Sequence, residues 1–380
     1  MRSIVIIGER YAKNLGDGVI CQCVEQLARR FAKPDDQIRC LDLSCRANYH
    51  ELYDLAPVHL VDRISGHLFA AAPVRALLKK RMGEAQLVYW TWHWRNRRTV
   101  LQLSKTHPAD LVVFAGGELF KDYFLFNMRF FVRAYSKQGS KIWFNACGVD
   151  KHNTEYVTNA YRKLLRNPQI CRITTRNDPE TCSRLIPKAQ YRFMPDSAVC
   201  AADFFAAGEK KGERCIGLGI MAIVDLEEKR AQLLSFWDKL IKTLEHNNIS
   251  YRLFCNGAPE DETFLREVAS FSAVADDRTL PAPQTPQELV SQITSFDAVC
   301  AFRMHSVILA YAFEIPFVGF AWDRKISDFA KYAEAENQIV DWEQITAEQI
   351  MEKLFSFRVP SSRLAELKEK IYIEFSEALK

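Results

Sequence analysis

The chain has 380 residues, of which 48% are hydrophobic, 12% aromatic and 26% charged. This composition is typical of a globular protein of two domains, and it excludes a disordered chain or one that depends on disulfides or metals for stability. The net charge of +4 is nearly neutral for this length, which excludes a general nucleic-acid binder.

The eleven cysteines are scattered, and no C-x-x-C occurs among them. We therefore expect reduced cysteines in a cytoplasmic protein, with no disulfide framework and no zinc or other metal site. A strand is expected directly at Ser3, with no secretory leader before it. The longest apolar run, from Val307 to Trp322, is interrupted by Glu314 and Pro316 and is too short to span a bilayer.

In the first half of the chain, short apolar runs alternate with longer segments of helical period. Strands are expected at 3–8, 37–43, 110–115, 140–146 and 170–175, and helices at 17–32, 118–137, 153–166 and 178–186. Such alternation is typical of a parallel sheet covered by helices on both faces. Residues 44–109 are the least regular part.

A polar, glycine-bearing break at 207–213 is the expected linker to a second series of the same kind. Here strands are expected at 214–221, 250–255, 296–302 and 316–320, helices at 225–246, 259–271, 305–313, 346–356 and 362–379, and a loop at 274–286. The chain is therefore predicted to be an α/β protein with two Rossmann-like domains, 1–206 and 214–356. Residues 357–380 are expected to form a helix that packs back on the first domain. Because ligands bind at the carboxyl ends of parallel strands, the cleft between the domains is the expected active site.

Two glycine-bearing turns follow expected strands and are candidate binding loops. Their candidate ligand-binding residues are Asn14, Gly16, Asp17, Gly116, Gly117 and Glu118. In the first turn, Asp17 is a candidate helix N-cap. In the second, the paired glycines would expose backbone N–H groups toward an anion or a sugar. Both turns are equally compatible with plain tight packing, and the first lacks the third glycine of a dinucleotide-binding fingerprint.

Basic side chains recur where strands are expected to end. Arg176 follows strand 170–175, where it would bind a carboxylate or phosphate, or else pair with a local acid such as Asp178. Lys325 follows strand 316–320, with Asp323 as a candidate cap for the next helix.

The most specific element is Arg303-Met304-His305-Ser306, at the end of strand 296–302. Arg303 and His305 would share one face if the strand geometry persisted, and both would lie at a helix N-terminus that favours anions. A histidine within reach of a substrate proton is the commonest general acid or base. The alternative is a histidine that caps the helix or is buried.

Residues Arg75 to Arg98 contain seven basic residues and one acid, together with three tryptophans, among them Trp92 and Trp94. Exposed tryptophan rings would stack on a sugar or lie at an anionic membrane surface, which suggests peripheral contact with the inner face of a membrane. The alternative is a strand with one face packed inward. Nucleic-acid stacking needs a broader basic field, so no nucleic-acid partner is expected.

Taken in order, these motifs resemble the polysaccharide pyruvyl transferase family. The matching segments are 14–20, 115–120, 174–178, 195–198 (Pro-Asp-Ser-Ala) and 303–310, followed by Pro316, Val318, Asp323 and Lys325. The arginine–histidine pair and the Asp-x-Lys behind it are the most specific. In three places the chain departs from the family pattern, with Asn177, Glu180 and Ala115 where Asp, Ser and Gly are usual.

The resemblance implies a fold similar to the GT-B glycosyltransferases. It also implies transfer of a pyruvyl group from phosphoenolpyruvate, a co-substrate rather than a bound cofactor, to a lipid- or nucleotide-linked sugar. The product would be a cyclic ketal, with release of phosphate. The family's basic residues would fall on Arg176, Arg303 and His305, with His305 transferring a proton and Asp17 or Glu118 as a second acid–base group. The alternatives are a nucleotide-sugar-dependent glycosyltransferase and a non-catalytic glycan-binding protein.

Overall fold

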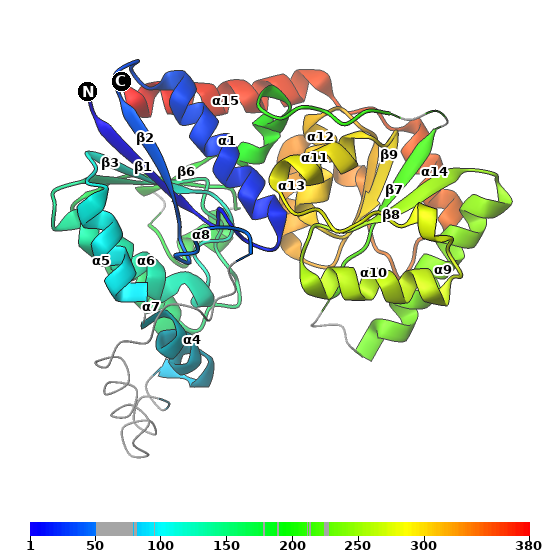
Figure 1. Ribbon diagram of the computed structural model, residues 1–380, viewed down its shortest axis with the longest axis horizontal. Coiled ribbons are helices and arrows are strands. Elements are labelled where there is room, and N and C mark those ends of the chain that lie inside the picture. The colour runs from blue at the N-terminus through cyan, green and yellow to red at the C-terminus, as the bar shows by residue number, and fades with distance from the viewer. Residues whose placement is uncertain are drawn as a thin grey trace. The chain divides into compact units, whose positions relative to one another are not determined.

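The computed structural model describes residues 1–50, 79, 82–94, 96–177, 179–187, 190–210, 212, 214–223 and 228–380. They divide into two compact units, each built on one parallel sheet (Figure 1). Unit 1 comprises Met1–Tyr11, Val24–Asp196 and Phe375–Lys380, and unit 2 comprises Ala12–Cys23 and Ser197–Glu374. Helix α1 (Leu15–Phe31) and helix α15 (Ser361–Leu379) therefore each contribute residues to both units.

Unit 1 contains a sheet of six parallel strands in the order β2-β1-β3-β4-β5-β6. The strands are β1 (Ser3–Gly8), β2 (Gln37–Asp42), β3 (Leu111–Ala115), β4 (Lys141–Asn145), β5 (Ile170–Thr175) and β6 (Arg192–Phe193). The five strands predicted here are confirmed to within one residue, and only the two-residue β6 was not predicted. The order reverses between β1 and β3, and in such sheets the crevice at the carboxyl ends of these two strands is where ligands bind.

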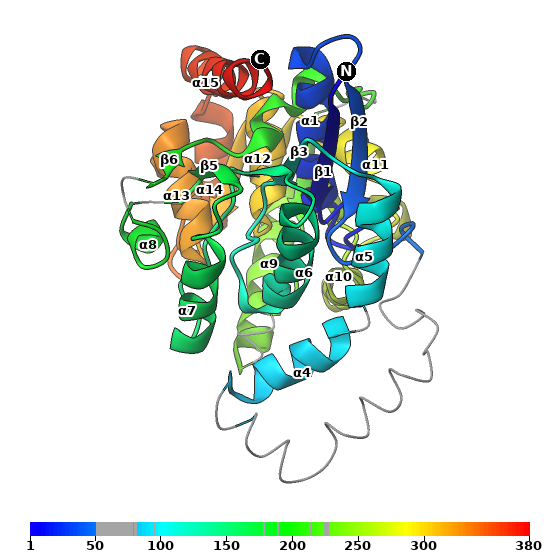
Figure 2. The same ribbon diagram turned by 90° about the vertical axis from the view of Figure 1, so that its left-hand side faces the viewer.

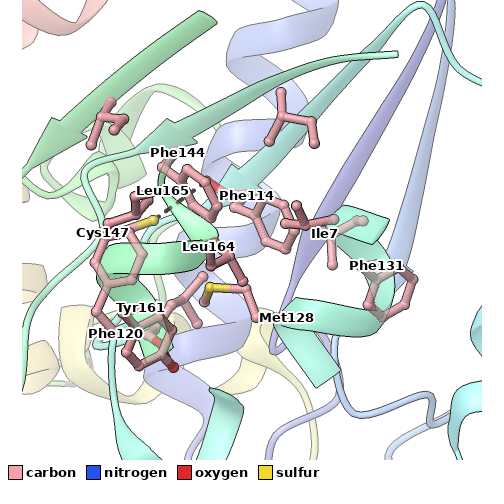
Figure 3. Packing of buried hydrophobic residues seen from close by; sticks show 14 of the residues in the cluster. Ile7, Phe114, Phe120, Met128, Phe131, Phe144, Cys147, Tyr161, Leu164 and Leu165 are labelled. Atoms are coloured by element: carbon pink, nitrogen blue, oxygen red, sulfur yellow. Dashed lines mark hydrogen bonds between the residues drawn. The ribbon is translucent and has the colours of Figure 1, made fainter. Parts of the chain in front are cut away.

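The helices between these strands are α4 (Glu84–Trp94), α5 (Asn96–Thr106), α6 (Leu125–Ser136), α7 (Glu155–Leu164) and α8 (Pro179–Ser183). Alternate strand residues point to opposite faces of the sheet. Phe114 and Phe144 point to one face, where their rings stack with centroids 4.7 Å apart and contribute to the apolar core beneath α5, α6 and α7 (Figure 3). On the other face, Trp143 packs against Phe375 of α15.

Unit 2 repeats this arrangement with five parallel strands in the order β11-β10-β9-β7-β8. The strands are β7 (Cys215–Gly219), β8 (Ser250–Phe254), β9 (Ala298–Ala301), β10 (Phe317–Phe320) and β11 (Ile339–Val340). The order reverses between β7 and β9. The loop after β9, which contains Arg303, therefore lies at the switch point of this sheet.

Unit 2 also contains the 3-10 helix η3 (Ser197–Asp203) and the helices α9 (Arg230–His246), α10 (Pro259–Phe271), α11 (Pro286–Thr294), α12 (Met304–Ala312), α13 (Arg324–Ala333) and α14 (Ala347–Ser356), together with two three-residue 3-10 helices, η5 (Asp276–Arg278) and η6 (Glu336–Gln338). Every residue of α12 is buried, because it packs against β9 and β10 and against η3, α11 and α13. A helix with apolar residues on every side is typically buried in this way. In the described part of the chain, no helix has both the length and the hydrophobicity that crossing a bilayer requires.

The segment 84–106 differs most from the sequence prediction. The run from Tyr89 to Trp94, for which a strand was the alternative, lies in helix α4, and α5 follows directly. Its apolar residues fit a helix because Leu87 packs with Met82 and Phe126 in a small cluster. Residues 75–78, 80, 81 and 95 of the basic stretch lie outside the described residues.

His93 makes the stability of α4 dependent on pH. Its side chain is 1% exposed, and neither ring nitrogen has a hydrogen-bond partner among the described residues. Burial lowers the pKa of His93 to about 4, whereas an unfolded chain has a histidine pKa of about 6.5. The unfolded chain thus binds the proton first as the pH falls, so the free energy of unfolding decreases between pH 6.5 and 4.

Between pH 7 and pH 5, we predict that the wild type loses about 2 kcal/mol more of its free energy of unfolding than His93→Phe does. Urea denaturation at the two pH values, followed by tryptophan fluorescence, measures this difference. His246→Gln, at the exposed end of α9, is the matched control and should change nothing. An equal loss of stability in wild type and His93→Phe would contradict the prediction.

Candidate active site

Arg303 is held by a buried carboxylate that sequence reasoning missed. It is the N-cap residue of α12, and its Nε and Nη2 donate to Oδ2 and Oδ1 of Asp261, both at 2.7 Å. Asp261 lies in the first turn of α10, is fully buried, and also accepts the backbone N–H of Ala222 at 3.0 Å. Arg303 Nη1 has no hydrogen-bond partner among the described residues. One edge of the guanidinium is thus fixed, and the other is suited to an anion.

The charge of Arg303 is maintained although its side chain is only 19% exposed. Burial alone would lower the pKa of Arg303, but the pair with Asp261 outweighs this effect and holds the pKa above its ordinary value. The carboxylates of Glu260 and Asp17 act in the same direction. Arg303 therefore presents a permanent positive charge at the carboxyl end of β9.

His305 lies two residues farther on, in the first turn of α12, and its side chain is 6% exposed. The backbone of Gly16 lies directly against its ring: a Cβ at position 16 would be 2.3 Å from His305 Nδ1 and 2.5 Å from its Cγ. No side chain fits there. The Asn-Leu-Gly-Asp motif and the Arg-x-His motif are far apart in the chain but are thus in direct contact in the fold.

Asn256, in the loop after β8, connects the first turns of the two helices. Its backbone carbonyl accepts the N–H of Leu15 at 3.0 Å, and its side-chain Oδ1 accepts the hydroxyl of Ser306 at 2.7 Å. Asn256 is 1% exposed, and its Nδ2 has no hydrogen-bond partner among the described residues. The starts of α1 and α12 are therefore fixed side by side, and both helix N-termini carry partial positive charge.

Asn14 and Asp17 lie at the start of α1, but Asp17 does not have its predicted position as N-cap. The helix begins at Leu15, so Asp17 belongs to its first turn and is not the N-cap. Its backbone N–H donates to the carbonyl of Asn14 at 3.2 Å, and Asn14 Nδ2 donates to Asp17 Oδ2 at 3.3 Å. The carboxylate of Asp17 instead acts on the charge of Arg303.

Lys325 is linked to the same loop through a tryptophan. Asp323 caps α13 as predicted, accepting the N–H of Lys325 at 3.1 Å. The Lys325 ammonium lies 4.7 Å from the centre of the Trp322 ring, and Trp322 Nε1 donates to the carbonyl of Phe302 at 2.7 Å. Because Phe302 directly precedes Arg303, Trp322 fixes the backbone of the site from the side of β10.

Unit 1 has its own cluster around Arg176. Arg176 follows β5, is 7% exposed, and pairs with Asp196 of the Pro-Asp-Ser-Ala motif. The expected alternative partner, Asp178, lies outside the described residues. A Cβ at Gly148 would come within 3.2 Å of Arg176 Nε, Glu118 Cα and the Gly117 carbonyl. The structure therefore brings Arg176 together with the second glycine turn.

The second glycine turn is shaped mainly by its own packing. Gly116 and Gly117 have φ values of 54° and 71°, which favour glycine. The N–H of Gly116 donates to the Asn145 carbonyl at 2.8 Å, so it does not point toward a ligand as predicted. The Gly117 carbonyl accepts the N–H of Gly148 at 2.6 Å. The Glu118 carboxylate lies 3.9 Å from Lys121 Nζ.

The tryptophans of α4 do not join either cluster through their described contacts. Trp94 contacts Trp90, Phe130 and the guanidinium of Arg97, which lies 4.3 Å from the centre of its ring. The side chain of Trp92 lies outside the described part of the chain. Trp92 and Trp94 therefore remain a prediction as substrate-binding residues.

Solved structures similar to this chain define its fold class. S. aureus MnaA in a co-structure with UDP has a TM-score of 0.58 and 11% identity, covering 100% of this chain and 98% of its own. UDP-GlcNAc 2-epimerase from Methanocaldococcus jannaschii has a TM-score of 0.56 and 8% identity, covering 94% and 93%. The Neisseria meningitidis enzyme bound to UDP-GlcNAc has a TM-score of 0.53 and 11% identity, covering 99% and 94%. The fold is thus α/β with two domains of GT-B type, as predicted.

The family follows from the sequence itself. The family model for polysaccharide pyruvyl transferase matches residues 14–324, which is most of the chain. The protein belongs to the polysaccharide pyruvyl transferase family, as its motifs predicted. No curated protein sequence matches the chain.

The contact between Gly16 and His305 gives a specific prediction. In a helix, Gly→Ala ordinarily stabilises by up to about 1 kcal/mol. At Gly16 we expect the opposite sign, because the added methyl would displace the imidazole of His305. Gly16→Ala should lower both the thermal midpoint and turnover.

A double-mutant cycle tests whether the side chain of His305 is the cause. In a His305→Gly background the ring and the Cβ of residue 305, which would lie 2.5 Å from the added methyl, are both absent, so Gly16→Ala should there be neutral or stabilising. Thermal midpoints of the four proteins measure the coupling. Equal destabilisation of both backgrounds by Gly16→Ala would show that the His305 side chain is not what excludes a Cβ at position 16.

Proposed function

We propose that this protein transfers the pyruvyl group of phosphoenolpyruvate to a sugar, forming a cyclic ketal across two hydroxyls and releasing phosphate. The observation that carries the proposal is the arrangement at the start of α12. There Arg303 has one guanidinium edge bound to Asp261, and His305 lies in the same first turn. Membership of the polysaccharide pyruvyl transferase family supports the same activity.

The charges of this region suit phosphoenolpyruvate, which carries a carboxylate and a phosphate on a three-carbon frame. Arg303 can bind one of these groups bidentately through its second edge. The N-termini of α1 and α12 add partial positive charge beside it, and backbone N–H groups at such termini commonly bind phosphate. Lys325, tied through Trp322 to the residue before Arg303, would supply a further charge.

The proposed reaction conserves atoms and charge. A proton is added to the methylene carbon of phosphoenolpyruvate, and a sugar hydroxyl forms a bond to the adjacent carbon and loses its own proton. The bond from that carbon to the phosphate oxygen then breaks. A second hydroxyl closes the ketal, and its proton leaves with the phosphate. We assign proton transfer to His305, with Asp17, in the same unit, as a second acid–base group.

In unit 1, Arg176 and Glu118 are proposed to bind the sugar acceptor. Arg176 is oriented by Asp196, as Arg303 is by Asp261. Asn177, where the family usually has Asp, accepts the N–H of Val149 at 2.6 Å through its Oδ1. A neutral side chain can make this contact as well as a carboxylate, so the departure is compatible with an intact loop.

The first test is a thermal-shift titration with phosphoenolpyruvate beside a panel of nucleotide sugars. A ligand that binds the native state at 100 times its dissociation constant stabilises it by about 2.7 kcal/mol, which corresponds to a shift of several degrees. We expect a saturable shift with phosphoenolpyruvate that is lost in Arg303→Lys. This variant keeps the charge opposite Asp261 but loses the planar fork.

Arg266→Lys is the matched control, because Arg266 lies on α10 with a side chain that is 73% exposed. It should respond to phosphoenolpyruvate like the wild type. A shift with a nucleotide sugar alone, and no phosphate release when both compounds are present, would contradict the proposal and indicate a GT-B glycosyltransferase. Proteins of similar fold have been solved with bound UDP and UDP-GlcNAc, so the nucleotide sugars belong in the test.

A further inference from the structure

One face of unit 1 carries a positive charge that the proposed chemistry does not use. Helices α5, α6 and α7 lie side by side on it, with α6 in the middle (Figure 2). Helices α5 and α6 contain no Asp or Glu, and α7 contains only Glu155. Five exposed cations of α6, α7 and the turns behind them line one groove and are here called the basic face: Arg129, Arg133, Lys137, Lys163 and Arg166. None of these five pairs with an acid among the described residues.

The basic face is organised around a stripe on α6. Arg129, Arg133 and Lys137 are spaced four residues apart, so they follow one side of the helix. They line a groove of about 850 Å³ on the α7 side, which also contains Lys163 and Arg166. They line a second groove of about 380 Å³ on the side of α4 and α5. Among the residues that the structure describes, no acid lines either groove.

The second groove adds aromatic and apolar side chains to these charges. Trp90, Trp94 and Phe130 line it, and the exposed Leu101 lies at the same groove. Trp94 lies against Trp90 and the Arg97 guanidinium, at 5.0 and 4.3 Å. Proteins that bind single-stranded nucleic acid instead present open aromatic faces to the bases. Tryptophan next to arginine and lysine is typical of the membrane interface, where the ring and the charges meet the headgroups.

The position of the basic face separates it from substrate binding in unit 1. The larger groove is lined by Lys137, Pro168 and Gln169, which precede β4 and β5. It therefore lies toward the amino ends of these strands, whereas substrates of parallel sheets bind at the carboxyl ends. Arg176 and the glycine turn follow the carboxyl ends of β5 and β3.

We propose that the basic face docks on the surface of a bilayer containing anionic lipids, in peripheral contact. Each Lys or Arg near such a surface strengthens binding about fivefold, and salt screens the attraction. Five cations that have no acidic partner in the described part of the chain, with an aromatic groove beside them, fit a flat anionic surface better than a small soluble anion. The inference does not depend on the proposed reaction.

Sedimentation with vesicles tests the proposal, using phosphatidylcholine alone and an equal mixture with phosphatidylglycerol. We expect the full chain to sediment with the anionic vesicles only, and to be released by high salt. Arg129→Gln/Arg133→Gln/Lys137→Gln should weaken this binding about 100-fold. The matched control, Lys239→Gln/Lys242→Gln/Lys331→Gln, removes three exposed charges from α9 and α13 of unit 2, and it should bind like the wild type.

Three results would overturn the proposal. The first is wild-type protein that stays in solution with anionic vesicles at low salt. The second is equal binding by the two triple variants and the wild type. The third is tighter binding to an oligonucleotide, measured by fluorescence polarisation, than to the anionic vesicles, which would assign the basic face to nucleic acid. Circular dichroism of all three proteins ensures that a loss of binding is not a loss of fold.

Discussion

The pair between the buried Asp261 and the partly buried Arg303 is the interaction on which the rest of the candidate site depends. Removing two charges from water is costly, and breaking one side of such a pair typically costs about 3–5 kcal/mol. Here the cost is offset by two hydrogen bonds of 2.7 Å and a third from Ala222. The pair thus joins the segments after β7, β8 and β9, whose carboxyl ends meet at the switch point of the sheet.

His305 depends on this arrangement because it lies one half-turn beyond Arg303. Gly16 leaves room for its ring, and Asn256 holds the first turns of α1 and α12 together. Reactive groups placed at helix starts are oriented by backbone that is already fixed, which lowers the entropy lost on binding. In unit 1, Asp196 pairs with Arg176 as Asp261 pairs with Arg303.

The sequence predicted the two sheets well because their strands are continuous apolar runs. It predicted poorly which side chains of the site contact one another. Arg303 and His305 were expected to share a strand face, yet β9 ends at Ala301 and His305 is helical. Asp261 was missed, although a signal existed. It shares the buried stripe of α10 with the residues Phe264, Leu265 and Val268, where an acid needs a buried partner. Which arginine supplies that partner is decided only by tertiary packing.

The most direct test of this account is the affinity for phosphoenolpyruvate of Asp261→Asn, measured by isothermal calorimetry against Glu260→Gln. Both changes remove one negative charge near Arg303, but Glu260 is half-exposed and 3.9 Å away. If Asp261 acts by orienting the guanidinium, Asp261→Asn should weaken binding about 10- to 100-fold, and Glu260→Gln should change it little. Unchanged or tighter binding by a folded Asp261→Asn would contradict the account, because Asp261 would then be only a counter-charge.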